Sequence, residues 1–138
     1  QIPLDPATGA VTEERIDDRG VEFPTLDDRL TGRRNRYLYT RADAGDDVAV
    51  VKYDTATGAS TEHVLGAEVV LGEAEFVAST APDRAEDDGW LMAIVSRRDG
   101  SASQLLVLDA SDVAAAPVAA VHLPRPVPTG FHGSWIPD

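Results

Sequence analysis

The sequence predicts an all-β protein of antiparallel strands, arranged as about two blades of a β-propeller. The first observation is a repeat: the turn-like segment at residues 4–10 recurs at residues 53–59, about 50 residues later, and a looser copy begins at Leu108. The second is that short runs rich in β-branched and aromatic residues lie between these turns. A repeat of this length with several short strands in each unit is typical of propeller blades.

The repeated segments have the composition of hairpin turns. Each contains an Asp followed by small residues and a Gly, at Asp5–Gly9 and again at Asp54–Gly58. An Asp side chain accepts hydrogen bonds from the backbone just after it, and Gly adopts the positive φ that tight turns require. We therefore expect tight turns at both places, joining antiparallel strands, and no helix of three or more turns anywhere in the chain.

The remaining elements follow from the alternation of apolar runs and turn residues. The run at residues 90–96 is apolar nearly throughout, which favours a central strand, and the run at 104–108 is expected to pair with it. The only helical pattern is a single turn at residues 111–115. In chain order, we expect strands at residues 11–16, 36–40, 48–53, 60–64, 75–78, 90–96, 104–108 and 118–123.

The last stretch, residues 124–138, carries the strongest candidate functional residue, His132. Prolines at alternate positions lead into it, so this segment should run extended and outside any central ladder. Glycines at positions 130 and 133 leave room beside the imidazole for backbone or a bound group. Phe131 and Trp135 are expected to fix the segment in a core. Two hypotheses follow: His132 is a ligand delivered to a buried site, or it is a buried histidine hydrogen-bonded in a terminal strand.

Composition narrows the class of protein. The 138 residues include 24 acidic and 12 basic side chains, a net charge of −12 that repels phosphate backbones and argues against a nucleic-acid partner. There is no cysteine, which excludes disulfides and thiolate metal sites and favours a reducing, cytoplasmic location. The acidic clusters lack the alternate spacing and closing Glu of a calcium loop. No apolar run is long enough to cross a bilayer.

The number of repeats predicts that more sequence is needed to complete the fold. A propeller has at least four blades, and this chain supplies about two. Two blades alone leave open strand edges, which proteins avoid. We therefore expect residues 1–138 to be the C-terminal part of a single larger propeller domain, or to assemble with other chains. The start at Gln1 in place of Met points the same way.

The proline stretch and the two units before it resemble the C-terminal part of the carotenoid cleavage dioxygenase family, also known as the retinal pigment epithelium membrane protein family. The resemblance starts near Glu22 and continues to the last residue. The order of the motifs makes it specific, whereas each motif alone is weak. The motifs are Val21-Glu22-Phe23-Pro24, Gly72-Glu73-Ala74-Glu75-Phe76-Val77, Glu86-Asp87-Asp88-Gly89-Trp90-Leu91, Leu106-Val107-Leu108-Asp109-Ala110, Val121-His122-Leu123-Pro124 and Val127-Pro128-Thr129-Gly130-Phe131-His132-Gly133.

The resemblance implies a seven-bladed propeller with one Fe(II) on its axis, held by four histidines from different blades. Such an enzyme uses dioxygen to cleave a carbon–carbon double bond of a conjugated substrate into two carbonyl products. His132 matches the last of the four ligands. Glu22 and Glu73 match carboxylates that hydrogen-bond ligand imidazoles. His63 and His122 match no ligand, so this chain carries one of the four, and the N-terminal blades are needed for the rest.

The residue types suit that chemistry. Imidazole is a good ligand for iron, and a hydrogen-bonded carboxylate orients the ring and raises its basicity. From the residues alone, the favoured interpretation of Glu22 and Glu73 is a solvent-exposed acid beside a strand, the more so for Glu73 because Glu68 and Glu75 lie close by. Glu75 departs from the family pattern, because an apolar residue is expected there. With one ligand present, we expect the chain alone neither to bind Fe(II) tightly nor to cleave a polyene.

Several functions stay open at this stage. The favoured one is an Fe(II) dioxygenase acting on a carotenoid, an apocarotenoid or a stilbene-like phenylpropanoid, with dioxygen as co-substrate. The family that the chain resembles also includes an enzyme that isomerises a retinoid ester instead of cleaving a double bond, and this activity is a further, less favoured alternative. The alternatives are a non-catalytic propeller that serves as a binding or scaffold module, and a secreted or periplasmic propeller hydrolase. Peripheral contact with a membrane is an additional expectation for an enzyme that draws an apolar substrate from a bilayer.

Overall fold

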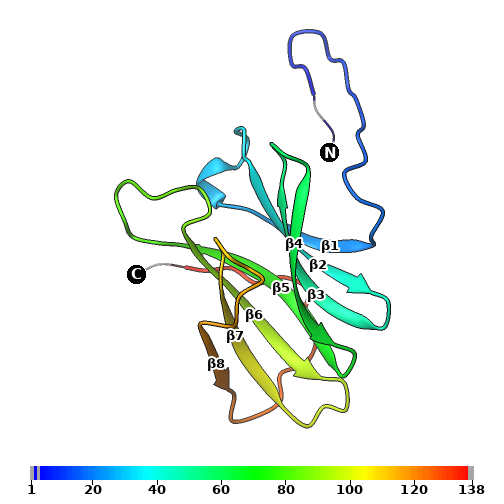
Figure 1. Cartoon of the computed structure of the whole chain (residues 1–138), viewed down its shortest axis with the longest axis vertical. Helices are drawn as coiled ribbons and strands as arrows, with labels where there is room; N and C mark the ends of the chain where they lie inside the picture. Colours follow the sequence, from blue (N-terminus) through cyan, green and yellow to red (C-terminus); the bar gives the residue numbers. More distant parts are fainter. Residues whose placement is uncertain (1, 3, 137–138) are drawn as a thin grey trace.

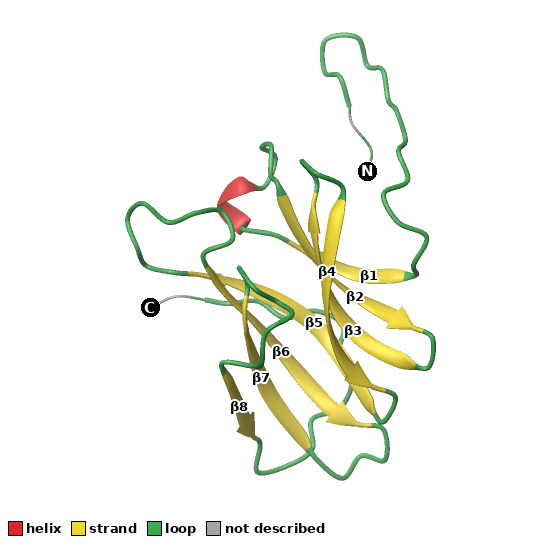
Figure 2. Ribbon diagram, viewed as in Figure 1, coloured by secondary structure: helices red, strands yellow, loops and turns green. Residues whose placement is uncertain are grey.

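The described part of the computed structural model, residue 2 and residues 4–136, contains eight strands in two four-stranded antiparallel sheets (Figures 1 and 2). In each sheet the strands are neighbours in chain order, which is the meander of a propeller blade. The fold is therefore all-β, as predicted, and its single described helix is a 3₁₀ turn, η1 (Asp28–Leu30). The strands are β1 (Val21–Thr25), β2 (Tyr37–Ala44), β3 (Asp47–Asp54), β4 (Ala59–Gly66), β5 (Val69–Ala78), β6 (Gly89–Arg97), β7 (Ser103–Asp109) and β8 (Ala119–His122).

Most of the expected strands are present, but two predictions differ from the structure and one strand was not predicted. The strand at residues 11–16 is wrong: a single bridge joins Leu4 and Val11, and residues 12–16 are exposed coil without a pairing strand in the described chain. Conversely, β1 was not expected, because Pro24 interrupts its pattern. Strand β5 begins at Val69, six residues before the predicted start. The predicted pairing of residues 90–96 with residues 104–108 is confirmed, and β6 is a central strand.

Both repeated turns form by the same hydrogen bonds, but only the second joins two strands, β3 and β4, whereas the first closes a single bridge. In the first, the Gly9 N–H donates to the Asp5 carbonyl, and the Asp5 carboxylate accepts from the Ala7 N–H. In the second, the same two bonds run from Gly58 and Ala56 to Asp54. Both glycines have positive φ, 71° and 74°. The recurring sequence is therefore a recurring turn.

The two sheets pack face to face around one apolar core. Tyr39 of β2 stacks on Phe76 of β5 with ring centroids 5.5 Å apart and planes within 6° of parallel. Stacked aromatic pairs add to the free energy gained from burying their area. Val50 of β3, Leu71 of β5 and Leu91 of β6 are each almost completely buried in the same cluster. The sheets thus share a core in the manner of adjacent propeller blades.

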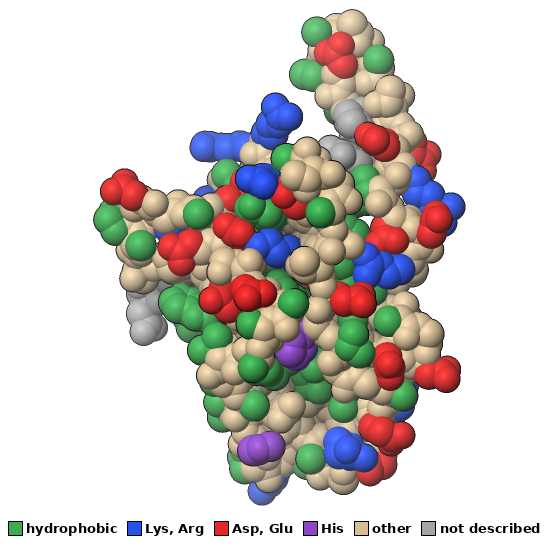
Figure 3. Space-filling model, viewed as in Figure 1, with side chains coloured by type: hydrophobic (Ala, Val, Ile, Leu, Met, Phe, Trp, Pro, Cys, Tyr) green, Lys and Arg blue, Asp and Glu red, His purple; other side chains and the backbone are tan. Residues whose placement is uncertain are grey.

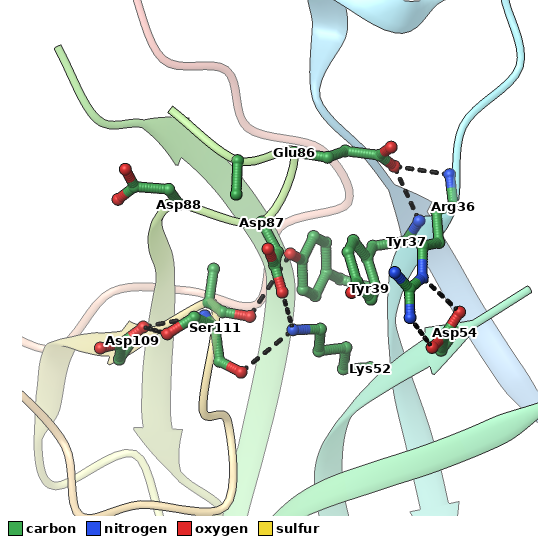
Figure 4. A network of polar contacts seen from close by, with 12 residues as sticks. Arg36, Tyr37, Tyr39, Lys52, Asp54, Glu86, Asp87, Asp88, Asp109 and Ser111 are labelled. Carbon is green, nitrogen blue, oxygen red and sulfur yellow. Dashed lines mark hydrogen bonds and ion pairs between the residues drawn. The ribbon is translucent and has the colours of Figure 1, made fainter. Parts of the chain in front are cut away.

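The loop between β5 and β6, residues 79–88, ties the second sheet to the first (Figure 4). The Glu86 carboxylate accepts from the N–H groups of Arg36 and Tyr37, at 2.6 and 2.8 Å, at the start of β2. Asp87 pairs with Lys52 of β3. Arg84 is almost completely buried and pairs with Asp27 just before η1. These contacts fix the relative position of the two sheets beside the core.

The surface is strongly acidic, in keeping with the net charge of −12. Figure 3 shows acidic side chains scattered over the visible face, without a single continuous patch. Among the described residues, no helix is long and apolar enough to cross a membrane.

Candidate functional site

The C-terminal segment, residues 124–136, lies along the face of the second sheet that points away from the first sheet; we call it the strap. It contains no strand, as the alternate prolines predict. On β6, Leu91, Ala93 and Val95 face the core between the sheets. The alternate residues Ile94 and Ser96 therefore face the strap and line the hollow beneath it. The strap thus runs over a partly apolar sheet surface.

Two serines anchor the strap near its start. The Ser96 hydroxyl donates to the Val127 carbonyl at 3.1 Å, and the Val127 N–H donates to the Ser103 hydroxyl at 2.8 Å. The two hydroxyl oxygens are 2.7 Å apart. Since the proton of Ser96 points to Val127, Ser103 is the donor between the two hydroxyls. Both backbone groups of Val127 are therefore satisfied by a pair of side chains from β6 and β7.

Glu73 of β5 anchors the strap at His132. One carboxylate oxygen lies 3.3 Å from His132 Nδ1, and the other accepts from the Gly133 N–H at 2.8 Å. The Glu73 side chain is only 11% exposed, whereas that of His132 is 73% exposed. A neutral imidazole that donates from Nδ1 presents the lone pair of Nε2, which makes no hydrogen bond in the described chain. The structure therefore brings together two of the three predicted site residues.

The ring of His132 also touches the first sheet. Phe23 of β1 meets it edge to face, with centroids 5.5 Å apart and planes at 80°. Next to this contact, the Thr25 hydroxyl donates to the Ala74 carbonyl of β5 at 2.6 Å and joins the two sheets. Neither residue was predicted from the sequence to have a role. The available signal was the position of Phe23 inside the motif at residues 21–24.

Two expectations about the strap are wrong. Phe131 and Trp135 do not fix it in a core, because they are 77% and 51% exposed. Polar contacts to Ser96, Ser103 and Glu73 hold the strap instead. Consequently His132 is not buried in the described structure, and the alternative of a buried histidine in a terminal strand is wrong as well.

The glycines of this region are not needed for close approach in the described structure. A Cβ at position 130 or 133 would meet nothing within 4 Å, and one at Gly72 would make an ordinary contact with the Ile94 carbonyl.

The remaining candidates lie apart from His132. Glu22 is exposed on β1, where it pairs with Arg41 of β2 in the ladder, and its carboxylate makes no hydrogen bond or ion pair with the described residues. His63 lies on β4 and His122 on β8, and the hydrogen-bond and ring contacts of His132 within the described residues go to Glu73 and Phe23 instead. No group of three or more potential metal ligands exists within residue 2 and residues 4–136. The assignment of His63 and His122 as non-ligands therefore remains a prediction.

Glu75 of β5 stands where the family pattern has an apolar residue, and its surroundings suit a polar side chain. Burial raises the pKa of its carboxyl, an effect opposed by the nearby Trp135 N–H and reinforced by the charges of Asp28 and Glu73. It lines a second hollow with Met92 and the strap. A polar group is useful there because it faces a backbone donor of the strap.

The hollow beneath the strap is small. It measures about 220 Å³ and is lined mainly by apolar groups of β5, β6 and residues 127–133. Pockets for drug-sized molecules are usually about 300–1,000 Å³. This hollow is therefore too small to enclose a long conjugated substrate.

Comparison with known proteins decides the family. The family model for the retinal pigment epithelial membrane protein matches residues 1–137. The chain belongs to this family. Within the family, it is 42% identical over 140 residues to a carotenoid cleavage oxygenase of Mycobacterium tuberculosis. It is 34% identical over 140 residues to apocarotenoid-15,15'-oxygenase of Synechocystis. These matches cover 95% and 98% of the chain but 27% and 28% of the two relatives.

Solved structures of this family share the fold. The cobalt-substituted Synechocystis apocarotenoid oxygenase matches with a TM-score of 0.89 and 32% identity, over 98% of this chain and 29% of that protein. The two sheets are therefore part of the propeller found in these enzymes, as the repeat predicted. The chain spans less than a third of the length of the relatives it matches.

The donor set at the strap fits a metal that takes imidazole ligands. His132 offers Nε2, and Glu73 holds the opposite ring nitrogen, which is the usual arrangement behind a metal-bound histidine. One imidazole does not complete such a site, so a metal held here would need further ligands.

Proposed function

We propose that this chain forms the C-terminal part of an Fe(II)-dependent dioxygenase that cleaves a carbon–carbon double bond. The substrate class is a carotenoid, an apocarotenoid or a stilbene-like molecule, and dioxygen is the co-substrate. The names of the relatives support oxidative cleavage of such double bonds. The structural observation that supports the proposal is the contact between Glu73 and His132 Nδ1, which leaves His132 Nε2 available to a metal.

In this proposal each residue has a distinct task. Bound iron supplies the redox chemistry that allows dioxygen to react with an alkene. His132 holds the metal through Nε2. Glu73 accepts the Nδ1 proton, which fixes the tautomer and orients the ring. Glu22 orients the imidazole of another ligand that lies outside this chain, which agrees with its exposure and its lack of a partner here.

Site-directed variants of the iron-loaded, full-length protein test this assignment. His132→Ala should lose iron and turnover together. Glu73→Gln should lower iron affinity or turnover by a smaller factor, on the order of 10–100-fold, because an amide still orients a ring but carries no charge. His63→Ala and His122→Ala are the matched controls and should retain iron. Full iron content and turnover in Glu73→Gln would show that Glu73 has no such role.

The ligand count gives a second test. We expect the 138-residue chain by itself to bind Fe(II) weakly and to show no cleavage, because affinity comes from several preorganised ligands. Calorimetric titration with Fe(II), together with dioxygen uptake on a conjugated polyene, measures both. Tight stoichiometric binding that His132→Ala abolishes would contradict the ligand count. A full-length protein that contains no iron would instead favour a non-catalytic propeller.

A further inference from the structure

Phe23 has an unusual backbone conformation. Its φ is 55°, and it is the one non-glycine residue of the described chain with a positive φ. A bulky side chain rarely adopts this region, and a residue before proline normally stays extended with a negative φ. Such a conformation persists only where the surroundings enforce it, and it often marks a functional site.

A β-bulge creates this conformation. Glu22 pairs with Arg41 and Thr25 pairs with Tyr39, so Phe23 and Pro24 together lie opposite a single residue, Thr40. A bulge turns a side chain away from the regular alternation of the strand. Proline, which has no N–H, is tolerated at position 24 because an unpaired position in a bulge needs no backbone donor.

The bulge brings no evident benefit to the pairing of β1 with β2. The Thr40 hydroxyl opposite it is buried and has no hydrogen-bond partner in the described chain. A buried unpaired hydroxyl is destabilising. What the bulge does achieve is to direct the Phe23 ring against His132.

Glu73 and Phe23 restrain different motions of the imidazole. The Glu73 contact fixes one ring atom, Nδ1, but allows the ring to turn about the line from Nδ1 to the carboxylate oxygen. The edge-to-face contact with Phe23 restrains the plane of the ring. Restraint is needed because the imidazole is mostly exposed in this chain.

We propose that Phe23 is a positioning residue, whose ring sets the plane of the His132 imidazole and thereby the direction of Nε2. This rests on the proposed function, since the direction of Nε2 matters when that nitrogen is a metal ligand. The strained bulge at Phe23 and Pro24 is the device that carries the ring there. Through it, the first sheet contributes to the geometry of a ligand that belongs to the strap.

The first test uses metal-free protein with isotope-labelled histidine. The His132 ring resonances are assigned by their loss in His132→Gln. Phe23→Leu keeps an apolar side chain but removes the aromatic ring, so the His132 signals should shift and broaden. Phe23→Tyr should restore them. Phe131→Leu is the matched control, because Phe131 adjoins His132 in sequence but is 77% exposed. Unchanged His132 signals in Phe23→Leu overturn the proposal.

The second test measures the iron affinity of the full-length protein by competition with a chelator. Phe23→Leu should weaken affinity about threefold to tenfold, the range for loss of one edge-to-face pair, and Phe23→Tyr should restore it. If Phe23→Leu fails to fold, Phe23→Gly replaces it, because glycine accepts the positive φ. Loss of iron in His132→Ala with normal affinity in the Phe23 variants overturns this inference alone. Normal iron affinity in His132→Ala overturns the proposed function instead.

Discussion

Lys52 and Asp87 meet at the boundary between the two sheets, with Nζ 2.6 Å from the carboxylate oxygen (Figure 4). Their side chains are 9% and 16% exposed. The same ammonium group donates to the Ser111 carbonyl at 3.1 Å and lies 4.3 Å from the centre of the Tyr37 ring. One cation therefore connects β2 and β3 with two loops of the second sheet.

Removal of either charge should weaken the contact between the sheets. Lys52→Met keeps the apolar stem but leaves Asp87 unpaired, and we expect the free energy of unfolding to fall by about 2–3 kcal/mol. Asp87→Asn should have a similar effect. In the double variant the loss should be smaller than the sum of the two. Chemical denaturation of all four proteins gives the coupling energy, and strictly additive losses would show that the pair contributes nothing as a pair.

Gly89 has no room for a side chain. A Cβ there would collide with the Val77 carbonyl and crowd Phe76 and Ala78. We expect Gly89→Ala to lower stability by about 1–3 kcal/mol, as is usual for overpacking. Gly72→Ala is the matched control on β5, since its Cβ would make an ordinary 3.6 Å contact with the Ile94 carbonyl. Thermal unfolding compares the two, and equal melting temperatures would contradict the prediction.

The serine pair predicts a local effect on the strap. Ser103→Ala removes the acceptor of the Val127 N–H, while the two sheets keep their own ladders. Loss of such a bond is worth about 1–2 kcal/mol, so amide exchange in residues 124–136 should become about tenfold faster. Ser101→Ala is the control, because the Ser101 hydroxyl bonds only to exposed Asp99. Hydrogen exchange read by mass spectrometry measures the change, and unaltered exchange in the strap would exclude the anchor.

Glu75 predicts a pH-dependent stability. Burial raises the pKa of this carboxyl above 4.5, so the ionised form is disfavoured in the folded protein. The contribution of Glu75 to stability is complete below its ordinary pKa and is lost as the pH rises through the folded value. Glu75→Gln should therefore be more stable than the parent at pH 7, with the difference disappearing below pH 4.5. Glu68→Gln serves as an exposed control, and a pH-independent difference would contradict the assignment.

Local signals accounted for much of the fold, because most strands are flanked by their own turns. The turns at Asp5 and Asp54 depend on bonds within a few residues, so the sequence pattern was sufficient to place them. Strand β1 was missed because it contains Pro24 and a bulge, and both depend on a partner strand. Residues 11–16 have a strand-like composition, but a strand also needs a neighbour, which composition does not reveal.

The candidate site depended on the family resemblance for a physical reason. Glu73 and His132 are 59 residues apart in sequence, and no periodicity links them. Their contact was therefore expected only from the motifs that carry the resemblance. The roles of Phe23, Ser96 and Ser103 depend on contacts between different strands and the strap. Such contacts cannot be predicted from the type of a single residue.

The loop at residues 79–88 constrains how this protein can vary in length. Arg84, Glu86 and Asp87 hold Asp27, the start of β2 and Lys52 of β3, so residues inserted between positions 84 and 87 would break at least one of these contacts. In the turn at Asp54, residues 56–58 bond only within the turn and end in solvent, so extra residues at this tip leave the contacts of Asp54 and Thr55 with Arg36 intact. We therefore expect the hairpin between β3 and β4 to accept an inserted peptide tag or fluorescent reporter, and the loop at residues 79–88 before β6 not to accept one.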